Sequence, residues 1–276
     1  MSFFYSFDNR QYVSAHRGNR SIRPENSLCA FTASIGCCDF IEVDVQMSRD
    51  GVAVIHHDEV LGRTSNGAEL ATRLGKPSLR LDSWDLAELR QLDIGSWFLT
   101  VDPFATISQG MVSPDDRNLC MSQTIMTLSE LLNWAKNSRI PLNVEIKDQE
   151  GGRHDSTIVD TVLAAVASAD YTESTLISSF RHDYLRQVKQ KMPQIAIGVL
   201  QEEEHPDNLL QYLAALDAQA YHPDVEITTP ELIRELRGGG FGVNIFTVND
   251  PAIGRDLFSF GATAIFSDFP RLFRPC

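Results

Sequence analysis

The chain has 276 residues, of which 43% are hydrophobic and 22% charged, and its formal net charge at pH 7 is −13. This composition is that of an ordinary globular protein and excludes a disordered, collagen-like or coiled-coil chain. The negative charge argues against broad binding to nucleic acids or anionic membranes, which need a basic surface. It leaves room for an anionic substrate in a locally positive pocket.

Three features bear on the compartment. No apolar run approaches the ~18 residues that a membrane helix needs. The first eight residues lack the basic region of a signal peptide. The five cysteines are odd in number and show no Cys-x-x-Cys spacing, so we expect them to be reduced. These features predict a cytoplasmic protein without stable membrane insertion, and they leave the oligomeric state open.

Short apolar runs alternate with amphipathic segments along the chain. The runs predicted to be strands are 12–16, 40–45, 142–147, 175–179, 195–200, 218–221, 243–248 and 262–267. The helices predicted between them are 24–36, 128–138, 157–169, 182–191, 208–216, 230–237 and 251–261. Eight strands that alternate with helices predict parallel βαβ units closing into a TIM-type (β/α)8 barrel. We therefore expect residues 1–276 to form a single α/β domain.

Residues 61–127 interrupt this alternation with turns and one helical phrase at 83–92. An insertion of this length in a compact domain is usually functional. It follows a ninth apolar run, 52–57, directly. We therefore expect it to fold over the candidate site as a lid or small subdomain.

The segment from 42 to 58 carries the strongest local signal. Glu42 and Asp44 lie two residues apart on an apolar run, and an Asp-Gly turn at 50–51 leads into the run that ends at His57. Asp-Gly between apolar runs predicts a hairpin with a two-residue loop, in which Asp44 lies opposite His57 and not His56. The alternative is that these acidic residues lie on the solvated polar face of an amphipathic hairpin. It is disfavoured because the first arm is apolar enough to be buried, and buried carboxylates need a cation or strong hydrogen bonds.

Other polar groups follow the predicted strands. His16 and Arg17 end the first run, and alternation places Asn143, Glu145 and Lys147 on one face of the third. Reacting residues of barrels lie at the C-terminal ends of the strands. We therefore expect these side chains to point into the barrel mouth.

Glu42, Asp44 and Glu145 suit one hard divalent cation, which would be Mg²⁺, Ca²⁺ or Mn²⁺. Arg17 and Lys147 would neutralise phosphoryl oxygens, while the two histidines would exchange protons with the nucleophile and the leaving oxygen. Taken singly, a Glu-x-Lys pair is often a structural ion pair, and a histidine at a strand end is often only hydrogen-bonded. The convergence of all these groups favours phosphate-ester chemistry.

These motifs resemble the glycerophosphodiester phosphodiesterase family. The matching phrases are His-Arg-Gly at 16–18, Pro-Glu-Asn-Ser at 24–27, Ile-Glu-Val-Asp-Val at 41–45 with Asp-Gly at 50–51, His-Asp at 57–58, Asn-Val-Glu-Ile-Lys at 143–147 and Thr-Val-Asn-Asp at 247–250. The resemblance covers nearly the whole chain in the family's order. It implies a TIM-type barrel with an inserted segment, and metal-dependent hydrolysis of a small-molecule glycerophosphodiester to glycerol 3-phosphate and an alcohol.

Carried over by position, the resemblance implies roles for single residues. It makes His16 and His57 the acid/base pair and Arg17 and Lys147 the phosphate contacts. It makes the metal ligands Glu42, Asp44 and Glu145.

The chain departs from the family pattern at Phe246, where a tryptophan commonly precedes Thr-Val-Asn. We expect Phe246 to line the substrate site, together with Trp97 and Phe98 of the insertion, which would cover the leaving alcohol. Filling of the insertion's own small core by Trp97 and Phe98 is an equally good interpretation.

Two other functions compete with hydrolysis of this kind. One is a catalytically inactive barrel that binds a phosphorylated ligand, but no expected catalytic residue type is missing. The other is a phospholipase-type phosphodiesterase acting by internal attack, which a secretory signal would favour. The sequence leaves open the native metal, the leaving alcohol, which histidine is the acid, and whether water or the glycerol 2-hydroxyl attacks first.

Overall fold

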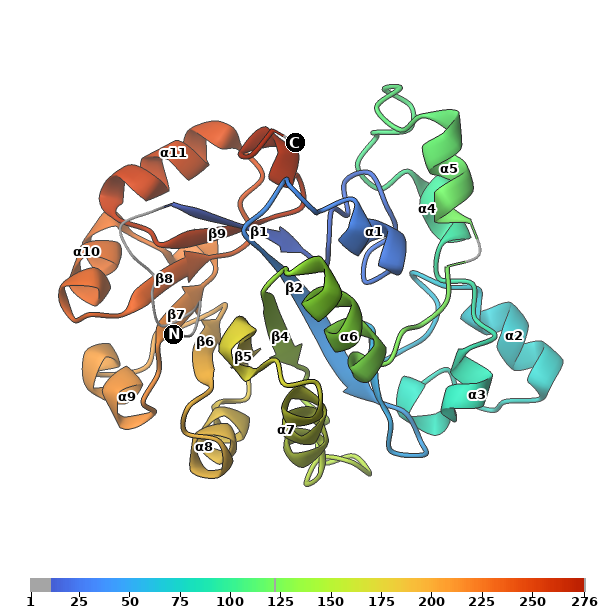
Figure 1. The fold of residues 1–276 in the computed structure, drawn as a ribbon, viewed down its shortest axis with the longest axis horizontal. Helices are drawn as coiled ribbons and strands as arrows, with labels where there is room; N and C mark the ends of the chain where they lie inside the picture. The colour runs from blue at the N-terminus through green and yellow to red at the C-terminus, as the bar shows by residue number, and fades with distance from the viewer. Residues whose placement is uncertain (1–10, 122, 276) are drawn as a thin grey trace.

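The computed structural model describes residues 11–121 and 123–275, and its centre is a closed ring of parallel strands (Figure 1). The order around the ring is β1-β9-β8-β7-β6-β5-β4-β2, and β1 pairs with β2 to close it. The ring strands are β1 (Tyr12–His16), β2 (Phe40–Met47), β4 (Leu142–Ile146), β5 (Thr175–Ser179), β6 (Ala196–Gln201), β7 (Ala220–Pro223), β8 (Gly242–Ile245) and β9 (Ala264–Ser267). The predicted TIM-type barrel of eight strands is confirmed.

Helices surround the ring in chain order. They are α1 (Leu28–Thr32), α6 (Leu128–Ser138), α7 (Ile158–Ser168), α8 (His182–Lys191), α9 (Leu209–Ala215), α10 (Pro230–Gly238) and α11 (Pro251–Phe260), with 3₁₀ turns at η3 (Thr172–Ser174), η4 (Val225–Ile227) and η5 (Pro270–Leu272). Thr229 and Asp250 cap α10 and α11 through their side chains, each followed by proline at the first helical position. Only α1 is much shorter than predicted.

The two faces of the strands have different surroundings. Val43 and Val45 of β2 belong to the large apolar core that includes residues of the outer helices, such as Leu131. Phe40 belongs instead to a small cluster in which its ring meets that of Phe266, with centroids 5.8 Å apart. Side chains alternate between the faces of a strand, so the face of Phe40 is also that of the carboxylates further along β2.

The ninth strand, β3 (Ala53–Ile55), pairs antiparallel with β2 outside the ring, as the hairpin signal predicts. The predicted register is wrong by one residue. Ser48 N donates to Val52 O, which leaves a three-residue loop closed by Gly51 at φ +81°. A glycine with positive φ in a three-residue loop is itself a common hairpin solution. The backbone of Asp44 is consequently paired with His56, whose N–H donates to the Asp44 carbonyl at 3.0 Å.

The insertion stands beside the ring and carries its own helices (Figure 1). These are α2 (Gly67–Leu74), η2 (Leu81–Ser83), α3 (Leu86–Leu89), α4 (Ser96–Val101) and α5 (Pro114–Cys120). Two small apolar cores hold it together, one around Trp84 and one around Phe98. Within the predicted helical phrase at 83–92 only the single turn of α3 is helical, because Trp84 is extended and Asp85 caps the helix.

Two further observations concern the expected compartment. The expectation that every cysteine is reduced is wrong: Cys29, Cys38 and Cys120 are free, but Cys37 is disulfide-bonded. Spacing along the chain does not reveal which distant segments a fold brings together. Over residues 11–121 and 123–275, no helix is both long and apolar enough to cross a membrane.

Candidate active site

Three buried carboxylates meet where β2 and β4 run side by side. The register pairs Asp44 with Glu145 and Glu42 with Asn143, so neighbouring strands bring all three acids to one place. Each acid offers an oxygen within 4.8 Å of the others'. Glu42 Oε1 and Asp44 Oδ1 are buried without a hydrogen-bond partner in the protein. Unpartnered carboxylate oxygens are costly to bury, and this donor set fits one hard divalent cation.

The pKa shifts of the three acids are also consistent with a cation site. Burial raises the pKa of Glu42 well above its usual value, and the neighbouring charges of Asp44 and Glu145 raise it further. Burial also raises the pKa of Glu145. At Asp44 burial acts upward, but the charges of Arg17, His57 and Lys147 outweigh it and lower the pKa. Asp44 is thus held ionised, and an added cation would favour ionisation of the other two.

Two cations border the cluster. Arg17 Nη1 donates to Glu25 Oε1 at 3.0 Å, and its Nε lies 3.2 Å from Asp44 Oδ2. Lys147 Nζ lies 2.7 Å from Glu145 Oε1. Arg17 has φ +55° and is followed by Gly18 at φ +85°, where a Cβ would lie 2.8 Å from that of Ala30. This tight turn after β1 directs the Arg17 backbone N–H to Glu42 Oε2 at 2.9 Å.

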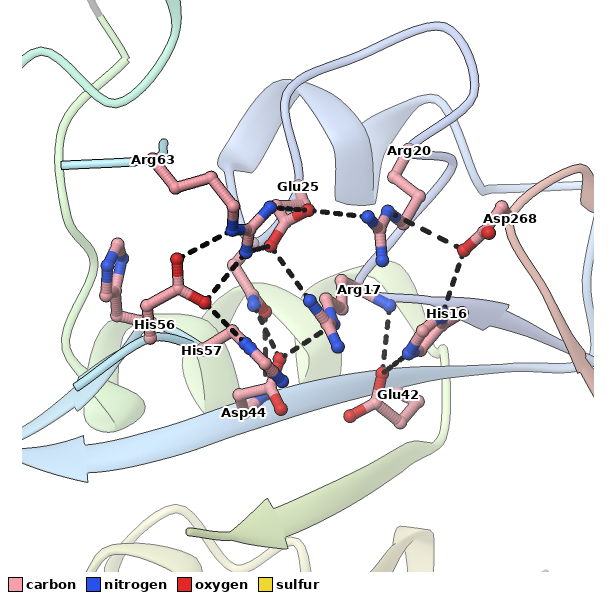
Figure 2. A network of polar contacts seen from close by, with 12 residues as sticks. His16, Arg17, Arg20, Glu25, Glu42, Asp44, His56, His57, Arg63 and Asp268 are labelled. Carbon is pink, nitrogen blue, oxygen red and sulfur yellow. Dashed lines mark hydrogen bonds and ion pairs between the residues drawn. The ribbon is translucent and has the colours of Figure 1, made fainter. Parts of the chain in front are cut away.

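Both histidines of the site are held in the same way. His16 Nδ1 lies 2.8 Å from Asp268 Oδ1 (Figure 2). In the same way, His57 Nδ1 lies 2.7 Å from Asp58 Oδ1. A carboxylate at Nδ1 favours the proton there and leaves Nε2 of a neutral ring as a base. Burial, together with the charge of Arg17, lowers the pKa of His16, although Asp268 opposes the shift.

The structure places His57, and not His56, in the cavity lining with His16. The predicted reason for this choice is wrong, because the observed register pairs the Asp44 backbone with His56. Since β3 ends at Ile55, strand alternation does not decide where the two histidine side chains point. His56 is buried and points away from Asp44 in Figure 2. Burial lowers the pKa of His56 to about 4.

A buried carboxylate that the sequence reasoning gave no role connects these elements. Glu25 accepts from Arg17 at 3.0 Å and from Arg63 at 2.7 Å, and lies 2.9 Å from Arg20 (Figure 2). Arg63 also donates to both oxygens of Asp58. The available signal was the Pro-Glu-Asn phrase at 24–26, between the first strand and the first helix.

The same network reaches both histidine partners. Arg20 Nε lies 3.6 Å from Asp268 Oδ1, and Asn26 donates to Asp44 Oδ2 at 2.7 Å. Arg63 belongs to the insertion, and its ion pairs with Glu25 and Asp58 connect the insertion to the site.

These groups open into one cavity of about 560 Å³ at the C-terminal ends of the strands. Its lining includes the predicted residues His16, Arg17, Glu42, His57, Glu145, Lys147 and Phe246. Asp44 lies directly behind this surface and is 1% exposed.

The predicted contact of Trp97 and Phe98 with the leaving alcohol stays a prediction, but their positions favour the other interpretation. Neither lines the cavity; Phe98 is fully buried in the insertion's core, and Trp97 packs edge-to-face against it. Their positions match the interpretation in which both side chains fill a small apolar core. In this structure no described residue of 61–127 lines the cavity.

Comparison with known proteins agrees with this geometry. Residues 16–272 match the model of the glycerophosphoryl diester phosphodiesterase family. A glycerophosphodiester phosphodiesterase of Bacillus subtilis (strain 168) is 27% identical over 273 residues, which cover 96% of this chain and 86% of that protein. A glycerophosphodiester phosphodiesterase of Caldanaerobacter subterraneus subsp. tengcongensis is 29% identical, with 94% of each chain covered.

A solved structure shares the fold as well. An Oleispira antarctica phosphodiesterase in complex with the product sn-glycerol-3-phosphate superposes with a TM-score of 0.78, at 28% identity, over 95% of this chain and 94% of that chain. The family match spans nearly the whole sequence and includes every residue of the carboxylate cluster and both histidines. The chain therefore belongs to the glycerophosphoryl diester phosphodiesterase family.

Proposed function

We propose that this protein hydrolyses glycerophosphodiesters to glycerol 3-phosphate and an alcohol, with one divalent cation and His/His acid–base catalysis. One observation carries the proposal: three buried carboxylates, two cations and two carboxylate-held histidines converge on one cavity. That donor set matches what transfer of a phosphoryl group from a diester requires.

The phosphate would lie between the carboxylate cluster and the two cations. Glu42, Asp44 and Glu145 would hold Mg²⁺, Ca²⁺ or Mn²⁺, which when bound supplies charge neutralisation of the phosphoryl oxygens. Arg17 and Lys147 are already fixed by carboxylates, so they would bind the phosphate with little loss of side-chain freedom. This preorganisation favours the developing charge of the transition state.

His16 and His57 would move the protons. One imidazole takes the proton of the attacking hydroxyl as the new P–O bond forms, and the other donates a proton to the leaving alcohol oxygen as the old P–O bond breaks. Asp268 and Asp58 orient the two rings and act as positioning residues. The cytoplasmic location inferred from the sequence stays a prediction.

The test is release of glycerol 3-phosphate from glycerophosphocholine, glycerophosphoethanolamine and glycerophosphoglycerol. We expect activity that a chelator abolishes and that Mg²⁺, Ca²⁺ or Mn²⁺ restores. Glu42→Gln should raise the metal concentration needed for half-maximal activity, whereas Glu235→Gln on the exposed face of α10 should not. Undiminished activity after complete metal removal would contradict the metal-dependent mechanism, and absence of product from all three substrates would contradict the function.

A further inference from the structure

Two free thiols meet where the insertion packs against the first βα unit. Cys29 lies in α1, and Cys120 ends α5 of the insertion. Neither is part of a disulfide, and a hydrogen bond joins their side chains. Neither residue lines the cavity of the candidate active site. The fold therefore brings together two thiols that lie far apart in the sequence, at a place that the hydrolytic chemistry does not use.

Other contacts hold the two segments against each other. The buried Arg23 guanidinium donates to Asp116 Oδ1, one turn before Cys120 in α5. The Cys29 backbone N–H donates to Gln123 Oε1 at 3.3 Å. The Cys120 side chain is fully buried in one of the insertion's two small apolar cores. The contact between the thiols thus belongs to a packed interface and not to a chance approach of exposed loops.

The two thiols differ in acidity and in exposure. The hydrogen bond from the Cys120 thiol lowers the pKa of Cys29, although burial opposes the shift. Ser27 Oγ, 3.2 Å from Cys29 Sγ, and the charge of Arg23 lower this pKa further. The hydrogen bond between the thiols, together with burial, raises the pKa of Cys120 well above its ordinary value. Because the thiolate is the reactive form of cysteine, the partly exposed Cys29 is the attacking thiol of the pair.

Cys38, the third free cysteine among the described residues, has the opposite properties. It is partly exposed like Cys29, but burial of its thiol raises its pKa to about 12. Its Sγ donates to the Ser34 carbonyl at 3.3 Å, and it packs against the large core. Structural thiols of this kind are inert. Cys38 is therefore a matched control for Cys29.

We propose that Cys29 and Cys120 form a redox-active dithiol, which a small-molecule disulfide converts into an intramolecular disulfide bond. The proposal goes beyond the proposed hydrolysis and does not depend on it. The new bond would join the insertion covalently to α1 and so fix the packing of these two segments.

The exchange balances in two steps. First, the Cys29 thiolate attacks one sulfur of the small disulfide, whose S–S bond breaks and releases a thiolate. The largest cause of the raised pKa of Cys120, its hydrogen bond to Cys29, is then lost. Second, the released thiolate takes the Cys120 proton, Cys120 attacks Cys29 Sγ, and a second thiolate leaves and takes up the proton that Cys29 lost to solvent. Two protein thiols are oxidised by two electrons, and one small disulfide is reduced to two thiols.

The first experiment treats the purified chain with oxidised glutathione, blocks the remaining thiols with N-ethylmaleimide and maps the peptides by mass spectrometry without reduction. We expect a cross-linked pair of peptides that contains Cys29 and Cys120, and dithiothreitol should reverse the cross-link. Peptide mapping also separates this bond from the existing disulfide of Cys37. Recovery of both Cys29 and Cys120 as free thiols would overturn the proposal.

Rates at limiting oxidised glutathione compare the two partly exposed thiols. Cys29 should react about 30-fold or more faster than Cys38, because a lower thiol pKa raises the thiolate fraction more than it lowers the nucleophilicity. Equal rates at the two residues would show that the contact with Cys120 does not activate Cys29, and the proposal would fail.

Three variants test the order of the steps, with circular dichroism as the check that each is folded. Cys120→Ala should stop at a mixed disulfide between Cys29 and glutathione, which mass spectrometry detects as a stable adduct. Cys29→Ser should form neither the adduct at position 29 nor the cross-link. Cys38→Ser is the matched control and should form the cross-link at the wild-type rate.

The remaining outcomes contradict the proposal. A mixed disulfide at Cys29 that persists in the wild-type protein would show that Cys120 does not attack it. Loss of the cross-link in Cys38→Ser would place the reactive thiol elsewhere. If Cys120→Ala does not fold, the wild-type peptide map and Cys29→Ser still decide. None of these measurements uses the hydrolytic reaction, so failure of the proposed function would not change their result.

Discussion

Two adjacent histidines in this chain have different surroundings, and they allow a matched test of the acid–base pair. His57→Ala and His16→Ala should each lower kcat by about 10²-fold or more, because general acid–base groups contribute about 10²–10⁴. His56→Ala removes a buried ring that does not line the cavity, so it should lower stability and change kcat only a few-fold. Steady-state kinetics on folded protein checks this, and full activity of His57→Ala would refute the assignment.

Glu25 makes a pH-dependent contribution to folding stability. Burial acts to raise its pKa, but the charges of Arg17 and Arg20, together with Arg63, lower it to about 2, from an ordinary value of 4.5. A carboxyl group whose pKa is lower in the folded than in the unfolded state stabilises the folded protein at pH values above its unfolded-state pKa. This stabilisation is therefore complete above about pH 4.5 and is lost as the pH falls toward 2.

Glu25→Gln should accordingly destabilise the protein by about 3 kcal/mol near neutral pH, where it leaves buried guanidinium groups without their shared partner. The difference from wild type should shrink as the pH falls from 4.5 toward 2. Urea unfolding at several pH values measures it, with Glu235→Gln as the exposed control. If the free energies of unfolding of wild type and Glu25→Gln differ by the same amount at every pH, ionisation of Glu25 is not coupled to folding.

At the scale of elements, β2 and β4 explain why much of the site could be predicted. Period-2 alternation and pairing of parallel strands are local rules, and they place Glu42, Asp44 and Glu145 together once the barrel is assumed. Strand number and most helix positions followed from the same periodicity. The positive φ of Gly18 and its closeness to Ala30 give the physical reason why a glycine follows His16 and Arg17.

Contacts between distant segments could not be predicted in this way. Nothing in the local pattern around Glu25 indicates that Arg63, 38 residues later, donates to it. The hairpin register depended on whether the loop has two or three residues, which Asp-Gly does not decide. Phe180 and Glu202 follow unremarkable strands, and only closure of the ring brings them to one mouth.

The insertion provides the element-scale prediction. Trp97 donates through Nε1 to the Ile94 carbonyl at 2.9 Å and packs on Phe98 within the insertion's core. Trp97→Ala should therefore lower the free energy of unfolding by about 2 kcal/mol, as a partly buried large-to-small change does, and leave the ranking of substrates by kcat/KM unchanged. Trp97→Phe should recover most of the stability. A changed ranking would instead support the lid interpretation of 61–127.

At the scale of the whole molecule, binding of a cation at the buried carboxylate cluster of this chain of net charge −13 would make metal binding and folding mutually dependent. The three acids come together only in the folded barrel, so a cation bound there stabilises the folded state alone. A metal concentration about 100 times Kd adds about 2.7 kcal/mol. For a chain of this size that corresponds to a rise in Tm of about 5–10 °C.

Asp44→Asn should lose most of this rise, because Asp44 supplies a buried carboxylate oxygen that accepts no hydrogen bond from the described residues. Glu235→Gln lowers the net negative charge equally from an exposed helix position and should keep the rise. KCl at the same ionic strength is the control for general screening of the acidic surface. Such screening acts over about a Debye length and does not need a divalent cation in the site. Thermal unfolding followed by circular dichroism measures each Tm. A rise in Tm that KCl reproduces, or that Asp44→Asn retains in full, would place the cation elsewhere on the protein.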